Sequence, residues 1–367
     1  MKTNLFCPNC FQSDCFNGRL CYQCGYEQKA AVDSRAMRAG VLLKNRYFLG
    51  RVLGIGGFGI TYLAFDSRLR QRCAVKEYFP VEWAVRMAGT NQIEPNSQLK
   101  DELYYHGKDV FVKEANILLE FQRESHIVNV RDFFEQNGTG YIVMEYLEGM
   151  DVKSILKQSG NKKDYEWCRR VILTVLHTLK DIHKRGVLHR DIAPDNVFVT
   201  NEGVIKLIDF GAAKHASELA NIRTEIVLKQ GYAPIEQYSK TAPQGPYTDL
   251  YAVAALFYRM LTGKKPAPAN ERVNEDTLVP PSTLGVSIPE QAEMAIMVCL
   301  NIYPEHRLQN ASDFMEALDG IGFEPKYEPD WILPYQLMIE KKESKFTKLS
   351  APVKGLILFG VLLIIAG

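Results

Sequence analysis

Four glycines between two β-rich runs are the feature that most limits how this chain can fold. The cluster is GIGGFG at residues 54–59, preceded by YFLGRVL and followed by ITYLAF. A GxGxxG loop that binds a dinucleotide leads from a strand into a helix, whereas the β-branched and aromatic residues of ITYLAF favour a strand. The pattern therefore predicts a strand, a glycine-rich turn and a second strand. Because glycines let backbone N–H groups approach an anion, such a flap suits phosphate binding, with an ordinary glycine-rich hairpin as the alternative.

The segments that follow predict a β-rich half and a helical half. RCAVKEYF favours a third strand, and a hairpin is expected around Asn137-Gly138. Residues 109–122 predict a helix with one apolar face formed by Val112, Ala115, Leu118 and Leu119. Helical patterns dominate after Gly149. We therefore expect an α+β fold with two lobes, a β-rich N-lobe over residues 46–148 and a helical C-lobe over residues 149–320.

Five motifs then occur in a fixed order along the chain. The glycine cluster is followed by CAVK with Lys76, by Glu114 on the predicted helix, by HRDIAPDN with Asp191 and Asn196, and by DFG with Asp209. In this order and spacing the chain resembles the eukaryotic-like protein kinase family over roughly residues 47–318, and in particular bacterial membrane-bound serine/threonine kinases. The resemblance implies a two-lobed kinase fold and transfer of the γ-phosphoryl group of ATP.

The resemblance also assigns roles to these motif residues. Lys76 would hold the α and β phosphates of ATP, and Glu114 would orient Lys76. Asn196 and Asp209 would hold Mg²⁺ (or Mn²⁺), and Asn196 does so without adding a negative charge. Asp191 would accept or orient the proton of the attacking hydroxyl, which requires a carboxylate.

Further positions match the nucleotide site of the family. VMEYLEGMD at residues 143–151 resembles the segment between the lobes that binds adenine. It gives Met144 as gatekeeper, the backbone of Glu145 and Leu147 at the base edge, and Asp151 near the ribose hydroxyls. The remaining expected contacts are apolar walls and the phosphate flap: Leu53, Ala74, Val143, Gly54, Gly56, Gly57, Phe58 and Gly59. The wall residues could equally be ordinary core residues.

Other residues match positions with an architectural or regulatory role. Glu236 in APIEQY resembles the glutamate that ends the activation segment, Arg307 its arginine partner, and Asp249 the aspartate that braces the catalytic loop. Arg190 precedes the catalytic aspartate, which goes with control by activation-loop phosphorylation because a phosphate can neutralise the arginine. The candidate self-phosphorylation sites are Thr224, which we favour, and Ser217.

One position departs from the family pattern. Serine/threonine kinases normally have a lysine two residues after the catalytic aspartate, and this chain has Ala193 there. Asp195 has the wrong sign to replace it. Aligning KQGYAPIE on Glu236 places Lys229 where it could project toward the space at Ala193, and we hypothesise that Lys229 supplies the displaced charge. The alternative is a solvent-facing lysine in a loop.

The cysteines predict a separate small module at residues 1–27. CPNC and CYQCG form a CxxC-x10-CxxC pattern from Cys7, Cys10, Cys21 and Cys24, a spacing suited to tetrahedral Zn²⁺ in a structural zinc ribbon. Gly25 would let the backbone turn so that its amides face sulfur. Cys15 is expected to be spare, and redox-active CxxC pairs are the alternative. Residues 28–45 are expected to be a charged helical linker.

The C-terminal segment predicts an association with a membrane. Residues 355–367, GLILFGVLLIIAG, are uninterrupted apolar sequence after a lysine-rich stretch. We expect a juxtamembrane segment at 321–353 and part of a transmembrane helix at 354–367, with the catalytic region on the cytoplasmic side. A C-terminal core helix is the alternative, but it would need a polar face.

Composition limits the partners. A formal charge of +1 and 46% hydrophobic residues indicate a globular chain without the basic excess that would favour nucleic acid. The expected partners are proteins that present serine or threonine, and a homodimer is left open. Two other functions compete with a kinase: a pseudokinase scaffold, favoured by Ala193, and a kinase-fold small-molecule phosphotransferase.

Overall fold

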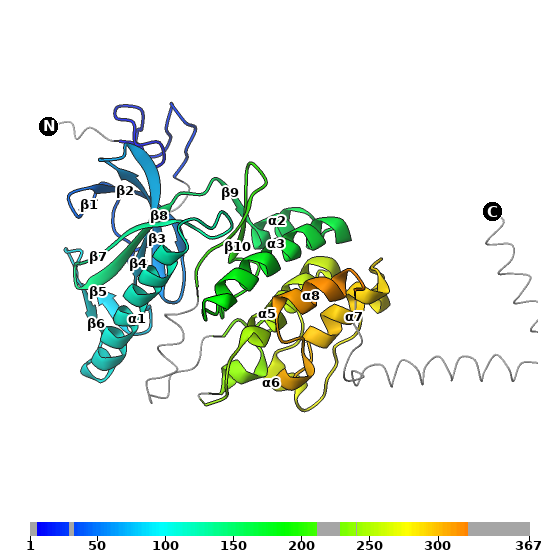
Figure 1. The fold of residues 1–367 in the computed structure, drawn as a ribbon. Helices are drawn as coiled ribbons and strands as arrows, with labels where there is room; N and C mark the ends of the chain where they lie inside the picture. Colours follow the sequence, from blue (N-terminus) through cyan, green and yellow to red (C-terminus); the bar gives the residue numbers. More distant parts are fainter. Residues whose placement is uncertain (1–5, 29–32, 211–227, 240, 322–367) are drawn as a thin grey trace, which may run out of the picture.

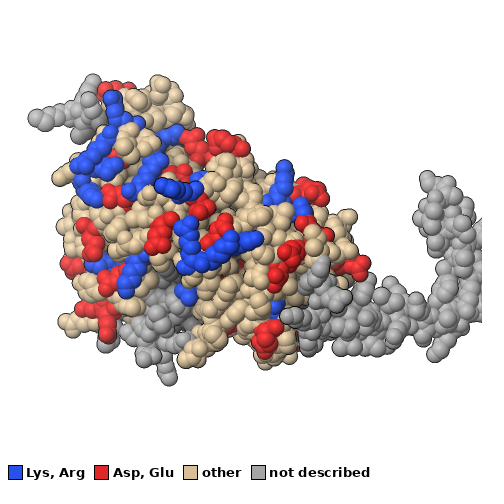
Figure 2. Space-filling model, viewed as in Figure 1, with Lys and Arg blue, Asp and Glu red and all other residues tan. Residues whose placement is uncertain are grey.

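The structure is a computed structural model, and it describes residues 6–28, 33–210, 228–239 and 241–321. The described chain forms two lobes joined by the segment after residue 145 (Figure 1). Acidic and basic side chains are interspersed over both lobes on the face shown in Figure 2. The expected division into a β-rich N-lobe and a helical C-lobe is confirmed.

The N-lobe is an antiparallel sheet in the order β1-β2-β3-β4-β8-β7. Its strands are β1 (Leu42–Leu43), β2 (Tyr47–Ile55), β3 (Gly59–Asp66), β4 (Gln71–Tyr78), β7 (Val130–Gln136) and β8 (Thr139–Glu145). Ile55 pairs with Ile60 across the glycine cluster, so the predicted strand, turn and strand are confirmed. Asn137 and Gly138 both have positive φ, 54° and 75°, as a tight two-residue hairpin requires.

Helix α1 (Asp101–Glu120) packs against β7 and β8. Ala115 and Leu118 are buried as expected. Val112 and Leu119 are half-buried, and Phe111 is the larger buried side chain on this face. A short hairpin, β5 (Ala84–Arg86) and β6 (Ile93–Pro95), and the 3-10 turn η1 (Gln98–Lys100) precede the helix.

The C-lobe is built around a buried helix, α5 (Pro246–Thr262), which contacts α3 (Tyr165–Lys184) and α7 (Glu290–Cys299). Nearly every side chain from residue 248 to 261 of α5 is buried. A small sheet with the order β11-β10-β9 supports the catalytic loop between the lobes. The remaining elements are β9 (Gly149–Asp151), α2 (Val152–Gln158), β10 (Val197–Thr200), β11 (Ile205–Leu207), η2 (Ile235–Tyr238), α6 (Ala269–Arg272), η3 (Pro281–Leu284), η4 (Pro304–His306) and α8 (Ala311–Leu318).

The expectation of a helix over residues 28–45 is wrong for the described part of that segment. It contains turns and the strand β1, and Ala36 and Met37 are buried in the N-lobe core. The backbone N–H of Met37 donates to the Tyr62 hydroxyl at 3.0 Å. Burial of apolar side chains against the sheet stabilises this segment more than formation of a solvent-exposed helix would.

Two expectations fall on parts of the chain that the structure does not describe. Thr224 and Ser217 lie outside the described residues, and so do residues 322–353 and the apolar segment 354–367. Among the helices of the described ranges, none has both the length and the apolar character needed to cross a bilayer.

Candidate active site

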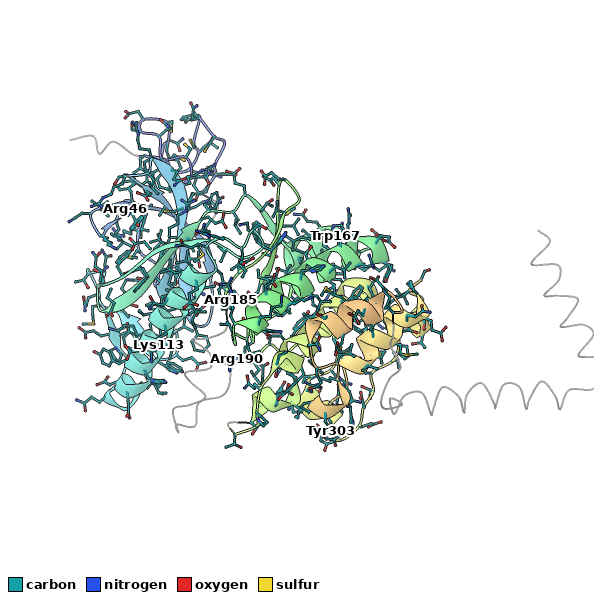
Figure 3. All side chains as sticks on the ribbon, in the orientation of Figure 1. Arg46, Lys113, Trp167, Arg185, Arg190 and Tyr303 are labelled. Carbon is teal, nitrogen blue, oxygen red and sulfur yellow. The ribbon has the colours of Figure 1, made fainter. Side chains whose placement is uncertain are left out.

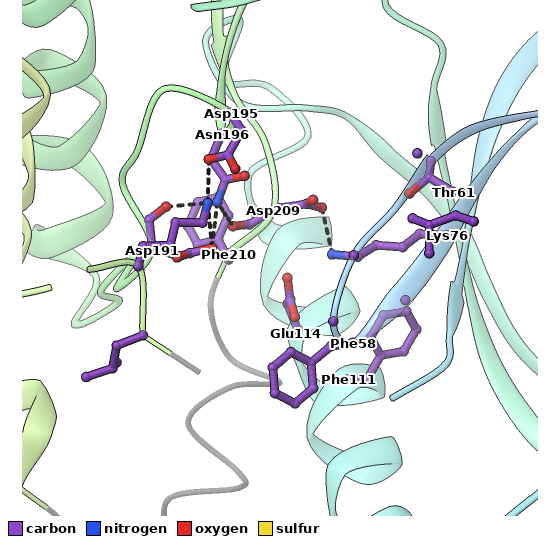
Figure 4. A pocket seen from close by; sticks show the side chains of 17 residues that line it. Phe58, Thr61, Lys76, Phe111, Glu114, Asp191, Asp195, Asn196, Asp209 and Phe210 are labelled. Atoms are coloured by element: carbon purple, nitrogen blue, oxygen red, sulfur yellow. Dashed lines mark hydrogen bonds and ion pairs between the residues drawn. The ribbon is translucent and has the colours of Figure 1, made fainter. Parts of the chain in front are cut away.

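A cavity of about 420 Å³ lies between the glycine loop and the catalytic loop (Figure 4). It collects residues from β2, β3, β4, α1 and the loops around β10 and β11, which are far apart in the sequence. The lining includes every motif residue expected at the phosphate end of the site: Gly54, Gly56, Gly57, Phe58, Gly59, Lys76, Glu114, Asp191, Asn196, Asp209 and Lys229.

Lys76 on β4 crosses the cavity to Asp209. The Lys76 Nζ donates to Asp209 Oδ1 at 2.6 Å, as the dashed line in Figure 4 marks. Burial by itself would lower the pKa of Lys76, but the carboxylates of Asp209 and Glu114 outweigh burial and raise it. Burial would likewise raise the pKa of Asp209, and Lys76 lowers it instead. Both groups are therefore charged near neutral pH.

Glu114 points into the same cavity from helix α1 (Figure 4). Its side chain is buried, and its charge helps to raise the pKa of Lys76. The sequence expectation made Glu114 the partner that orients Lys76. In this structure the ion pair of Lys76 is made with Asp209, and Glu114 adds a favourable charge to it.

Asn196 holds the carboxylate of Asp191. The Asn196 Nδ2 donates to Asp191 Oδ2 at 2.6 Å and to the Asp191 backbone carbonyl at 2.8 Å. A longer contact of 3.4 Å joins the same Nδ2 to the backbone carbonyl of Asp209. The donor hydrogens of Asn196 are thus directed to Asp191 of the same loop and to the Asp209 carbonyl, and the amide oxygen of Asn196 is the atom left for another ligand.

Lys229 reaches the catalytic loop at the place where the sequence leaves a gap. Its Nζ lies 3.2 Å from Asp191 Oδ2 and donates to Asp195 Oδ1 at 2.6 Å. Ala193 is buried between these residues and carries no charge. The lysine is not a solvent-facing side chain, because only 24% of its side chain is exposed. A cation from residue 229 therefore stands beside the carboxylate of Asp191.

The glycine loop closes one side of the cavity. The N–H of Gly56 donates to the Gly59 carbonyl at 2.8 Å, and a Cβ on Gly59 would lie 2.6 Å from the carbonyl oxygen of Glu77. Only glycine fits at that close approach between β3 and β4. Phe58 packs edge-on against Trp83 with ring centroids 5.7 Å apart.

The residues expected around adenine lie on neighbouring strands near this cavity but are not part of its described lining. Ala74 pairs with Met144 across β4 and β8, and Leu53 packs on the core. The N–H of Glu145 donates to the Asn129 carbonyl at 2.9 Å. The remaining expected contacts lie on the segment between the lobes and on β8: Val143, Leu147 and Asp151.

Asp151 has a structural role that the sequence expectation did not include. Its carboxylate accepts the N–H of Ser154 at 2.6 Å and caps helix α2. An N-cap of this kind satisfies a backbone donor that the helix itself cannot.

The C-lobe contains a buried network of charged side chains, and one member of it, Asp249, contacts the catalytic loop. Glu236 and Arg307 form an ion pair of 2.7 Å with side chains 2% and 0% exposed. The carboxylate of Asp249 accepts the backbone N–H groups of His189 and Arg190 at 2.9 and 2.7 Å. These contacts are those expected of Glu236, Arg307 and Asp249. Arg190 itself lies at the junction of the two lobes (Figure 3).

A match to a known family agrees with this geometry. The model of the protein kinase domain matches residues 47–318, well over half of the chain. This chain belongs to the protein kinase family. The resemblance to the protein kinase family inferred from the five motifs is confirmed, and this family implies ATP and a divalent metal as cofactors.

Curated relatives of this chain include bacterial serine/threonine kinases. The chain is 29% identical to a probable serine/threonine-protein kinase of Clostridium acetobutylicum over 297 residues, which cover 77% of this chain and 41% of the relative. It is 30% identical to the serine/threonine-protein kinase PknA of Nostoc sp. over 307 residues, 80% of this chain and 50% of the relative. The kinase thus spans two fifths to a half of the length of these curated relatives.

A solved structure shares the fold. PpkA-294 in its apo form superposes on this chain with a TM-score of 0.71 at 32% identity. The match covers 78% of this chain and 100% of the PpkA-294 chain. Its match supports the arrangement of lobes described above.

Two contacts of the kinase site were missed by sequence reasoning. His183 Nε2 lies 2.8 Å from Asp249 Oδ2, and Asp195 is the partner of Lys229. The position of His183 in the last turn of α3 gives no indication of a contact more than sixty residues away. For Asp195 the sequence did offer a signal, because a carboxylate two residues from a missing cation can position its replacement.

The cysteine module has the geometry of a tetrahedral site. The sulfurs of Cys7, Cys10, Cys21 and Cys24 all lie within 4.8 Å of one another. Cys7 and Cys24 sulfurs are 3.7 Å apart, and those of Cys10 and Cys21 are 3.8 Å apart. Four thiolates at about 2.3 Å from a zinc ion would lie about 3.8 Å from each other.

The surroundings of the sulfurs fit a zinc ribbon as well. Backbone N–H groups of Asn9 and Cys10 point at Cys7 Sγ at 3.4 and 3.5 Å, and Gly25 has a positive φ of 70° at the predicted turn. Cys15 Sγ is 3.5 Å from Cys21 Sγ, so the fifth cysteine lies beside the cluster and not apart from it.

This module packs on β2 and β3 of the N-lobe (Figure 1). Phe6 contacts Phe48 with ring centroids 4.6 Å apart, and Phe11 contacts Phe65 at 5.7 Å. A Cβ on Gly50 would lie only 2.2 Å from the Pro8 carbonyl oxygen. The glycine at position 50 of β2 is therefore what lets the module come this close.

Proposed function

We propose that this protein is an ATP-dependent serine/threonine kinase that phosphorylates protein substrates. The observation that carries the proposal is the convergence of Asp191, Asn196, Asp209 and Lys76 on one cavity beneath the glycine loop. The names of its relatives support serine and threonine as acceptors.

The site residues fit the reactants of this reaction. The carboxylate of Asp209 and the amide oxygen of Asn196 are hard oxygen donors, which Mg²⁺ or Mn²⁺ prefers. The bound metal would neutralise phosphate charge. Lys76 would bind the α and β phosphates, and backbone N–H groups of the glycine loop would cover them. Asp191 would take the proton of the hydroxyl whose oxygen bonds to the γ-phosphorus as the bond to ADP breaks.

Lys229 is part of this proposal as a catalytic cation. Its ammonium lies beside Asp191, where the transferred phosphoryl group must pass, and Asp195 holds it from the other side. Transition-state charge on the phosphoryl oxygens can then be stabilised although Ala193 carries none. The same alanine favours the pseudokinase alternative, in which nucleotide binds with weak or no transfer.

The deciding experiment incubates the full chain with labelled ATP and Mg²⁺ and compares wild type with Asp191→Asn. Label on serine or threonine that disappears in the variant supports the kinase. ATP binding without Asp191-dependent label indicates a scaffold, and label on small molecules alone indicates a metabolite phosphotransferase. Mapping the sites on the chain also tests Thr224 and Ser217 as self-phosphorylation sites.

We also propose that residues 6–27 form a zinc ribbon. The support is the matching sulfur spacing and the N–H groups directed at Cys7. Metal analysis of the purified chain should find about one zinc ion, lost in a double variant Cys10→Ser, Cys24→Ser. A chain that folds fully and contains no zinc contradicts this part of the proposal.

A membrane location completes the proposal. The apolar sequence of residues 355–367 and the lysines before it favour a single-pass protein with its kinase domain on the cytoplasmic side. Fractionation of cells that express the chain should find it in membranes, and deletion of residues 355–367 should release it. Recovery of the intact chain in the soluble fraction would contradict the location.

A further inference from the structure

A second cavity of about 320 Å³ adjoins the active site, and Ala193 is part of its lining. Four cationic side chains line it, and Asp195 is the one carboxylate among the described residues of its lining. The cations are Lys153, Lys229, Arg259 and Lys265. Three more positive than negative charges gather here in a chain whose formal net charge is only +1.

The position of this basic cavity ties it to the reacting hydroxyl. Lys229 and Asp195 line both cavities, and Lys229 Nζ is 3.2 Å from Asp191 Oδ2. An extended peptide advances about 3.3 Å per residue. A substrate whose hydroxyl meets Asp191 therefore brings side chains within about three residues of the acceptor to the basic cavity.

The cations of the basic cavity have little compensating negative charge. Arg259 donates to the Asn161 carbonyl at 2.7 Å, and Lys265 to the Gln230 carbonyl at 3.4 Å, so both meet neutral acceptors. In the described parts of the chain no ion pair involves Lys153, Arg259 or Lys265. Asp195 is already bound to Lys229. A cavity with this excess of positive charge favours binding of an anion and disfavours binding of a basic side chain.

We propose that the basic cavity selects substrates with an anionic side chain, a carboxylate or a phosphate, within about three residues of the phosphorylated serine or threonine. This inference rests on the proposed kinase function and adds the substrate class to it. The backbone of Lys153 is held against the catalytic loop, because its N–H donates to the Pro194 carbonyl at 2.9 Å.

The test measures kcat/KM of the full chain for a set of threonine peptides. One neutral peptide is compared with peptides that carry glutamate, phosphoserine or lysine at single positions from three before to three after the threonine. We expect at least one anionic position to raise kcat/KM about tenfold over the neutral peptide, as charge-assisted hydrogen bonds do. The glutamate and phosphoserine peptides show which anion is preferred, and lysine at that position should lower kcat/KM.

Two variants on helix α2 connect the preference to this cavity. Lys153→Glu should make kcat/KM equal for anionic and neutral peptides. Lys157 is exposed on the same helix and lies outside the lining, so Lys157→Glu should keep the higher kcat/KM for anionic peptides. Equal kcat/KM of the wild-type chain for neutral and anionic peptides, or a preference unchanged by Lys153→Glu, overturns the inference. Absence of both peptide phosphorylation and self-phosphorylation is a different result, which overturns the proposed function itself.

Discussion

The C-lobe contains two sets of charged side chains that differ in their exposure to solvent. In the buried network, Glu236 and Arg307 are 2% and 0% exposed and bond only to protein. In the cavity, the side chains of Asp209 and Asp195 are 40% and 39% exposed although each has a cationic partner. The buried ion pairs are closed to other ligands. The charged groups in the cavity can separate from their partners and bind a metal ion, a nucleotide or a peptide instead. Stability should therefore depend on the first set and turnover on the second.

The largest effect is expected from breaking the buried pair. Arg307→Ala leaves the carboxylate of Glu236 buried without its cation, and removal of one partner of a buried ion pair costs about 3–5 kcal/mol. The free energy of unfolding, measured by denaturant titration, should fall by about that amount.

The matched control is an arginine on the surface. Arg185 pairs with Glu124, and their side chains are 46% and 35% exposed. Arg185→Ala should change the unfolding free energy by about 1 kcal/mol or less. Equal losses for the two variants would remove the distinction between buried and open pairs.

The next effect concerns the cavity. Lys229→Ala should lower kcat by about 10²–10³, since a single electrostatic stabiliser of a transition state contributes about 2.7–4 kcal/mol. The KM for ATP should change little, because the Lys229 ammonium lies beside Asp191 and Asp195 of the catalytic loop. Steady-state kinetics with Lys184→Ala as an exposed-lysine control checks this. Wild-type turnover in the Lys229 variant would refute the relocated charge.

A smaller effect is expected from the cysteine module, which belongs to neither set. In Gly50→Ala the new Cβ would clash with the Pro8 carbonyl, and overpacking of this kind costs about 1–3 kcal/mol. Proteolysis between the module and the N-lobe should become faster while zinc content and kcat stay near wild type. A large fall in kcat would instead show that the module supports the glycine loop through β2.

The smallest effect is a pH dependence of stability at His189, which lies between Asp249 of the buried network and Asp191 of the cavity. His189 is buried, and burial lowers its pKa below the ordinary 6.5 against the opposing carboxylates of Asp249, Asp191 and Asp209, with Lys229 also lowering it. Its Nδ1 accepts the backbone N–H of Asp191 at 3.3 Å, which requires the neutral ring.

The sign of this dependence follows from proton binding. Below pH 6.5 the unfolded chain takes up a proton at His189 that the folded chain does not, so stability should fall on acidification by at most ~1.4 kcal/mol per pH unit. His189→Asn, which can still accept at the Nδ1 position, should flatten the slope below about pH 6.5. An unchanged slope would assign the dependence to other groups.

Local chemistry explains why much of this molecule was predictable. The strand after GIGGFG followed from β-branched and aromatic residues, and the Asn137-Gly138 hairpin from two residues that accept positive φ. The error at residues 28–45 has the opposite cause. Met37 is buried by strands that lie later in the chain, and no local pattern contains that information.

The sequence by itself determined the family, the order of the motifs and the residue types at each chemical step, because phosphoryl transfer admits few side chains at those steps. Only the tertiary structure decided that Lys229 comes to 3.2 Å from Asp191, that Asp195 holds it, and that Arg259 and Lys265 gather beside Ala193. These facts are distances between segments separated by tens of residues. They depend on how the lobes and loops pack, and a local sequence pattern carries no record of that packing.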